Sequence, residues 1–175
     1  MSTSTIDDSE VRNVIFRIKR GLCGYVSYLA ACEMNQAFSE YVLYEPILRI
    51  LTAQKYKVKC EHECPGIEQP KKGARKRLDF YAVGESHRFA LEVKWVKSRK
   101  LDIERDAEKL TAISKAEPDT FPLLCVFGRQ SNIEAVNLKS RNFKEWGKPV
   151  YADLRKTKYG CRVFRLYYAT NKRKE

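Results

Sequence analysis

The chain has 175 residues, of which 43% are hydrophobic, and its 34 Lys and Arg against 22 Asp and Glu give a net charge of +12. This length suits one compact domain with a hydrophobic core, and no apolar run approaches the roughly 20 residues that span a bilayer. Residues 1–10 are polar and slightly acidic rather than a secretory signal. We therefore expect a soluble, intracellular (cytoplasmic) protein without a membrane partner. The positive surplus favours nucleic acid as partner, with plain solubility or an anionic membrane surface as alternative explanations.

Helical spacing dominates the first third of the chain. After an expected loose tail at residues 1–9, apolar residues recur every three or four positions over residues 11–34, and Gly21 and Gly24 predict a break into two helices. A further helix is predicted over residues 36–54. Pro46 lies inside this segment and indicates either a kink or the true first turn of the helix.

Residues 56–64 alternate in polarity and predict a strand. Cys60, His62 and Cys64 share one face of this strand, between Glu61 and Glu63. Structural zinc sites bring two spaced pairs of ligands, so we interpret the three side chains as core-facing rather than as a metal site. The six cysteines are scattered without a C-x-x-C pair, and a single intracellular domain of this size does not need disulfides.

Alternating strands and helices continue to the C-terminus. A basic loop at residues 65–76 leads into strands over residues 77–83 and 88–96, joined by a turn at 84–87. A charged amphipathic helix follows over residues 102–116, and then a wholly apolar strand at 121–127 that predicts a central sheet position. We expect a helix over 133–146, strands over 150–154 and 161–169, and a frayed tail at 171–175. This order predicts an α/β fold of one domain over residues 1–175, with a mixed β-sheet flanked by helices.

The two strands around the 84–87 turn have a predictable register. If Gly84 pairs with His87, paired positions sum to 171, which sets Asp79 opposite Glu92 and Arg77 opposite Lys94. The face carrying Glu92 and Lys94 would then be polar. The other face would be core, formed by Leu78, Phe80, Ala82, Phe89, Leu91, Val93 and Trp95.

Opposed carboxylates repel one another and need compensation. Lys94 and Arg77 could supply it as a surface ion network. A divalent cation would supply it better, because Mg²⁺ binds one or two carboxylates and keeps positions for water and phosphate oxygens. Such a metal activates a water nucleophile, and a lysine can orient that water or offset charge in the transition state. Asp79, Glu92 and Lys94 therefore indicate phosphodiester hydrolysis.

The segment RLDFYAVGESHRFALEVKWV at residues 77–96 resembles the core of the PD-(D/E)XK nucleases. The order of one helix, three strands, a helix and a strand also matches the α-β-β-β-α-β core of this restriction endonuclease-like superfamily, over about residues 36–127. Leu78 stands where a proline often precedes the aspartate, and no Q-x-x-x-Y motif follows. The resemblance implies Mg²⁺, or Mn²⁺ in its place, bound by Asp79, Glu92 and the Val93 carbonyl, with Lys94 as the catalytic lysine.

Many members of this superfamily add a glutamate from the first core helix. In FSEYVLYEPILRIL, at residues 38–51, the best match is Glu40 and the second candidate is Glu45. The resemblance leaves the subgroup open, and many relatives dimerise to cut both strands, so a homodimer is compatible with it.

Basic residues flank the motif on both sides and could bind phosphates. They are Lys71, Lys72, Arg75, Lys76 and Arg77 before Asp79, and Lys97, Arg99 and Lys100 after Lys94. We therefore expect a metal-dependent nuclease acting on DNA, an endonuclease of the restriction, repair, resolvase or phage-defence type, with RNA not excluded. The alternatives are a nuclease-like module that binds nucleic acid without cutting it, and a protein-interaction domain with a basic surface.

Overall fold

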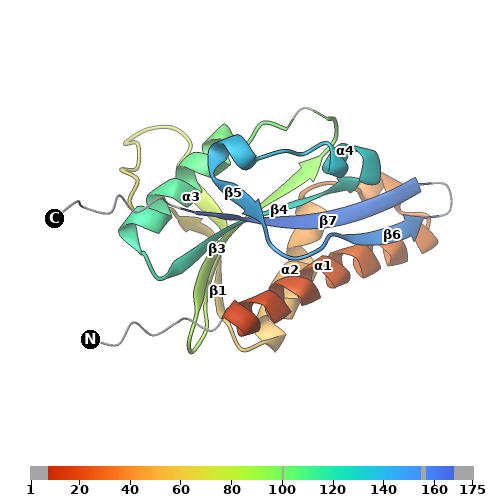
Figure 1. Ribbon diagram of the computed structural model, residues 1–175, viewed down its shortest axis with the longest axis horizontal. Coiled ribbons are helices and arrows are strands. Elements are labelled where there is room, and N and C mark those ends of the chain that lie inside the picture. Colours follow the sequence, from red (N-terminus) through yellow and green to blue (C-terminus); the bar gives the residue numbers. More distant parts are fainter. Residues whose placement is uncertain (1–7, 100, 155–156, 168–175) are drawn as a thin grey trace.

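A computed structural model describes residues 8–99, 101–154 and 157–167. Its centre is a seven-stranded mixed sheet in the order β1-β2-β3-β4-β7-β5, with β6 also paired to β7 (Figure 1). Strands β1, β2 and β3 are antiparallel neighbours, β4 runs parallel to β3, and β7 runs antiparallel to β4. The strands are β1 (Lys57–Glu63), β2 (Arg77–Val83), β3 (Arg88–Val96), β4 (Thr120–Arg129), β5 (Phe143–Glu145), β6 (Val150–Leu154) and β7 (Thr157–Leu166).

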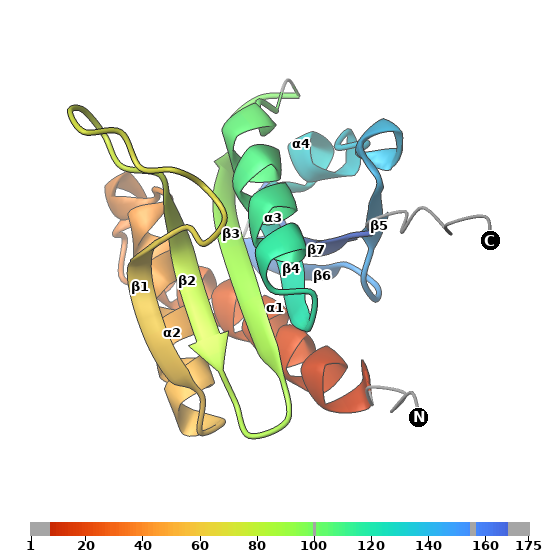
Figure 2. The same ribbon diagram turned by 90° about the vertical axis from the view of Figure 1, so that its left-hand side faces the viewer.

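Helices cover both faces of the sheet. Figure 2 shows α3 in front of the sheet and α1 and α2 behind it. One hydrophobic cluster lies under α1 and α2, and the other lies under α3 and α4. The helices are α1 (Asp8–Ala31), α2 (Tyr44–Ala53), α3 (Glu104–Ala116) and α4 (Gln130–Glu134), with 3₁₀ turns at Asn35–Ala37, Tyr41–Leu43 and Lys139–Arg141.

Helix α1 corrects our expectation of two helices broken at Gly21 and Gly24, because it is continuous. Its buried stripe continues along the helix past both glycines, from Val11 through Leu22 to Leu29. A Cβ at Gly21 would overlap the Ile50 side chain of α2, so this glycine allows a close approach of the two helices. Tertiary packing thus offsets the roughly 1 kcal/mol that a glycine costs inside a helix. The described part of the expected tail, Asp8 and Ser9, already belongs to α1.

The second helix begins later than expected. Two short 3₁₀ turns lie at Asn35–Ala37 and Tyr41–Leu43, and α2 itself begins at Tyr44, so Pro46 lies in its first turn. Proline is tolerated there because the first amides of a helix have no intrahelical acceptor.

The predicted bounds of β2 and β3 are confirmed, and so is part of their register. Phe80 to Val83 pair with Leu91 to Arg88, and the Gly84 amide donates to the His87 carbonyl at 2.8 Å. Away from the turn, the ladder ends at the pair of Phe80 with Leu91. The expected pairs of Asp79 with Glu92 and of Arg77 with Lys94 are therefore wrong. Leu78 also packs in the cluster under α3, whereas Phe80 packs in the cluster under α1 and α2. The alternation of faces therefore breaks at Asp79.

Strand β1 is an edge strand, and Cys60 on it is exposed rather than core-facing. Glu61 has a φ of 50°, which interrupts the two-residue alternation at that point. Cys64 is buried as expected, and His62 stacks on Tyr81 at 5.0 Å between ring centroids. All six cysteines are free.

The second half of the chain confirms some predictions and corrects others. Strand β4 lies between β3 and β7 and is buried from Thr120 to Gly128, as its apolar sequence predicts. The bounds of β6 are as predicted. The helix expected over 133–146 is wrong, because that segment holds the end of α4, a 3₁₀ turn and β5. The tail at 171–175 lies outside the described residues. Among the described helices, none is long and apolar enough to cross a membrane.

Candidate active site

Asp79 lies where β2 separates from β3. Its Oδ2 accepts a hydrogen bond from the Val93 amide at 2.7 Å, so the carboxylate takes the place of the missing strand partner. Burial, followed by a hydrogen bond to Asp79, raises the pKa of the Tyr44 hydroxyl from α2. The aspartate is thereby held between the sheet and the second helix.

Glu40 reaches the same edge of β3 two residues further along. Its Oε2 accepts from the Trp95 amide at 3.0 Å, from a position just before the Tyr41–Leu43 turn. Glu45 lies elsewhere: it is exposed, pairs with Arg49 at 2.8 Å and accepts from Tyr25 at 3.0 Å. Of the two glutamates that the sequence offers, only Glu40 therefore joins Asp79 on the free edge of β3.

Glu92 is buried, with 1% of its surface exposed. Burial first, and then the charge of Asp79, raises its pKa to about 9, while Lys109 acts in the opposite direction. Its Oε2 accepts from Lys109, and its Oε1 is buried with no hydrogen-bond partner among the described residues. An oxygen left in this way costs free energy unless a cation or water satisfies it.

Helix α3 contributes two charged side chains that we did not predict. Asp106 pairs with Lys94 at 3.1 Å, and Lys109 pairs with Glu92. Burial lowers the pKa of Lys94, but the carboxylates of Asp106 and Glu40 raise it on balance. A signal was present in the sequence, because Asp106 and Lys109 fall at helical spacing between Ile103, Leu110 and Ile113, on the buried stripe of α3.

Few carboxylates of the site are available to a metal ion. Within the described ranges, no group of three or more His, Cys, Asp or Glu side chains is placed to hold a metal ion. Asp79 nevertheless lies close enough to Glu92 for its charge to raise the pKa of that carboxyl, and one Glu92 oxygen has no hydrogen-bond partner among the described residues. Mg²⁺ can bind through one or two carboxylates with water in its other positions. The chemistry of Asp79 and Glu92 therefore suits Mg²⁺ or Mn²⁺, and ligation of a metal by Asp79, Glu92, Glu40 or the Val93 carbonyl stays a prediction.

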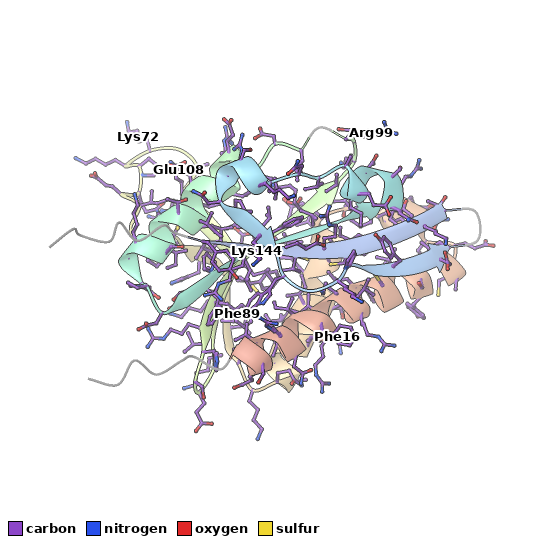
Figure 3. All side chains as sticks on the ribbon, in the orientation of Figure 1. Phe16, Lys72, Phe89, Arg99, Glu108 and Lys144 are labelled. Carbon is purple, nitrogen blue, oxygen red and sulfur yellow. The ribbon has the colours of Figure 1, made fainter. Side chains whose placement is uncertain are left out.

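The described residues among those predicted to bind phosphate lie at one end of the sheet, on the loop that leads into β2, at Arg77 where β2 begins, and on the loop that follows β3 (Figure 2). Lys71, Lys72, Lys97 and Arg99 are exposed, and Lys72 and Arg99 project from the same side of the molecule (Figure 3). Lys100 lies outside the described residues. Three others make local contacts: Arg75 pairs with Glu63, Lys76 pairs with Glu108, and the Arg77 carbonyl accepts from Lys109.

Tyr81 of β2 packs under a helix. It lies in the cluster under α3, and its hydroxyl donates to Glu117 at 2.6 Å. The site thus consists of Glu40, Asp79, Glu92 and Lys94, with Asp106 and Lys109 from α3.

Comparison of the chain with protein-family models, curated proteins and solved structures gives no match.

Proposed function

We propose that this protein is a metal-dependent nuclease that hydrolyses phosphodiester bonds in DNA. The observation that carries the proposal is the meeting of Glu40, Asp79, Glu92 and Lys94 at the point where β2 and β3 separate. The sequence motif requires only that three letters occur in order, whereas the structure holds two of the carboxylates on alternate amides of the strand that carries Glu92 and Lys94.

The arrangement of elements supports a restriction endonuclease-like fold. Helix α2 is followed by the antiparallel strands β1, β2 and β3, then by α3 and by β4 parallel to β3. This is the helix, three-strand, helix, strand order of the PD-(D/E)XK nucleases that residues 77–96 resemble. The two basic loops at the site end of the sheet are suited to contacts with phosphates of the backbone.

A divalent cation held by Asp79 and Glu92 would polarise the scissile phosphate and activate a water molecule. Lys94 would orient that water and offset charge on the phosphate in the transition state. Its partner Asp106 keeps the ammonium beside the carboxylates. Glu40 adds a second negative charge near Lys94 and so stabilises the protonated amine.

The decisive test is a cleavage assay with Mg²⁺ or Mn²⁺ on plasmid, linear duplex, single-stranded and branched DNA, with an RNA arm. The wild type should cut at least one DNA substrate, and the Lys94→Met variant should not. Lys115→Met removes the same charge from an exposed position at the end of α3 and should leave cleavage unchanged. Failure of the wild type on every substrate, or full activity of Lys94→Met, refutes the proposal.

One observation favours a second function, a nucleic-acid-binding module without catalysis. Lys94 and Lys109 are each paired with a carboxylate, so the charges of the site are partly balanced without a metal. Such a module would bind nucleic acid in a salt-sensitive way, with an affinity that neither metal nor Lys94→Met changes.

A further inference from the structure

Three oxygens from three different elements converge on the ammonium of Lys109. They are the Arg77 carbonyl of β2 at 2.9 Å, Oε2 of Glu92 on β3, and Oδ1 of Asp106 within α3 at 3.5 Å. Only 13% of the Lys109 side chain and 1% of the Glu92 side chain are exposed. The ammonium therefore bridges β2 and β3 at the place where their ladder has ended.

An environment of carboxylate and carbonyl oxygens is the one that hard divalent cations also select. A lysine ammonium is a compact point charge with three donors. The second Glu92 oxygen is buried, and neither this ammonium nor any other described group donates a hydrogen bond to it. A divalent ion carries twice the charge and can take more oxygens at once. Lys109 thus contacts the kinds of oxygen that a metal would bind, but it leaves one Glu92 oxygen without a partner.

From these contacts we infer that Lys109 is a resident counter-cation, which keeps the carboxylates assembled without metal and which a divalent ion displaces from Glu92. This inference rests on the proposed function, because it concerns the same metal site. It makes Lys109 a positioning residue in the metal-free protein. Displacement would free its amine from Glu92 for another anion, and a substrate phosphate has suitable charge. Nucleic acid should therefore strengthen metal binding, and metal should strengthen the binding of nucleic acid.

The test compares wild type, Lys109→Met, Glu92→Gln and the double variant, by thermal unfolding and Mn²⁺-binding calorimetry at mildly alkaline pH. In EDTA, Lys109→Met should melt below wild type, because Glu92 loses its partner. Mn²⁺ should restore at least half of the lost melting temperature in Lys109→Met, and it should raise the melting temperature of wild type by less. We expect Lys109→Met to bind Mn²⁺ about tenfold more tightly than wild type, and the double variant to show neither effect.

Lys115→Met is the matched control on the same helix and should behave as wild type with respect to Mn²⁺. Lys109→Gln, which keeps a donor for the Arg77 carbonyl, repeats the measurement with a smaller loss of packing. Equal Mn²⁺ affinity in wild type and both Lys109 variants, or no stabilisation of these variants by Mn²⁺, overturns the inference. In that case a wild type that binds Mn²⁺ and cuts DNA leaves the proposed function standing. A wild type that cuts nothing, beside a Lys109→Met protein that Mn²⁺ stabilises, refutes the nuclease alone.

Discussion

Lys19 and Lys109 are both lysines packed against the sheet, one on each face, and their surroundings differ in kind. Lys19 of α1 is 2% exposed, and the groups to which it donates within the described ranges are neutral, the carbonyls of Trp146 at 3.3 Å and Lys148 at 2.7 Å. Burial lowers its pKa. Burial lowers the pKa of Lys109 too, but Glu92 and Asp106 outweigh this effect and raise it.

The difference separates a structural lysine from a lysine of a site. Backbone carbonyls anchor an ammonium without restoring the solvation that a full charge loses on burial. Around Lys19 they connect α1 to the turn between β5 and β6. Opposite charges do offset that loss, but a fold that buries Glu92, Asp106 and Lys109 together concentrates charge where an apolar core would be more stable. Such a concentration is typical of functional sites.

The largest effect should come from the charged face. Asp79→Asn keeps an oxygen that can accept from the Val93 amide but removes the charge, so the protein should fold while cleavage falls by about 10²–10³-fold. The rate of plasmid cleavage in Mg²⁺ measures this. Glu45→Gln is the matched control, since Glu45 is the exposed glutamate that the structure separates from the site, and its rate should equal that of wild type. Equal losses in both variants would contradict the assignment.

The two lysines themselves should differ in stability. In EDTA, Lys109→Met leaves Glu92 buried without its partner and should lower the free energy of unfolding by about 3–5 kcal/mol. Lys19→Met leaves two carbonyls without a donor but also removes a buried charge, so about 1–2 kcal/mol is expected. Urea denaturation measures both. A larger loss of unfolding free energy in Lys19→Met than in Lys109→Met would contradict the distinction between a structural lysine and a lysine of the site.

The lowered pKa of Lys19 should make the stability of the protein depend on pH. Its pKa in the folded protein is lowered from 10.5, so between the two values the unfolded chain binds more protons than the folded one. Stability therefore rises as pH increases through the folded pKa towards 10.5. The free energy of unfolding of wild type, relative to Lys19→Met, should increase over this range in urea titrations. If this difference in the free energy of unfolding stays constant or falls as pH rises, burial does not lower the pKa of Lys19.

The smallest effects are expected on nucleic-acid affinity. Arg99→Gln removes one charge from a loop at the site end and should weaken DNA binding a few-fold, reducing the salt slope by about one unit. Arg17→Gln removes the same charge from the exposed surface of α1 and should change neither quantity. Fluorescence anisotropy at several salt concentrations measures both. Equal effects would show that DNA is attracted by net charge alone.

Much of the fold was predictable because its signals are local. Alternation placed β2 and β3 with their correct bounds, and the unbroken apolar run placed β4 at the centre of the sheet. The same signals located Asp79, Glu92 and Lys94 on neighbouring strands. Local rules failed at Gly21, where α2 packs closely against a continuous α1. They failed again within residues 133–146, where residues 143–145 pair with β7 instead of continuing a helix.

By itself, the sequence determined the strands that carry the motif, the excess of positive charge and the basic loops on either side of Asp79. Only the tertiary structure decided that the ladder ends before Asp79, that Glu40 rather than Glu45 reaches β3, and that Asp106 and Lys109 enter the site. The physical reason is how far along the chain the interacting residues lie from one another. Alternation and helical spacing are set by neighbours along the chain, whereas burying charges together depends on which helix covers which face of the sheet.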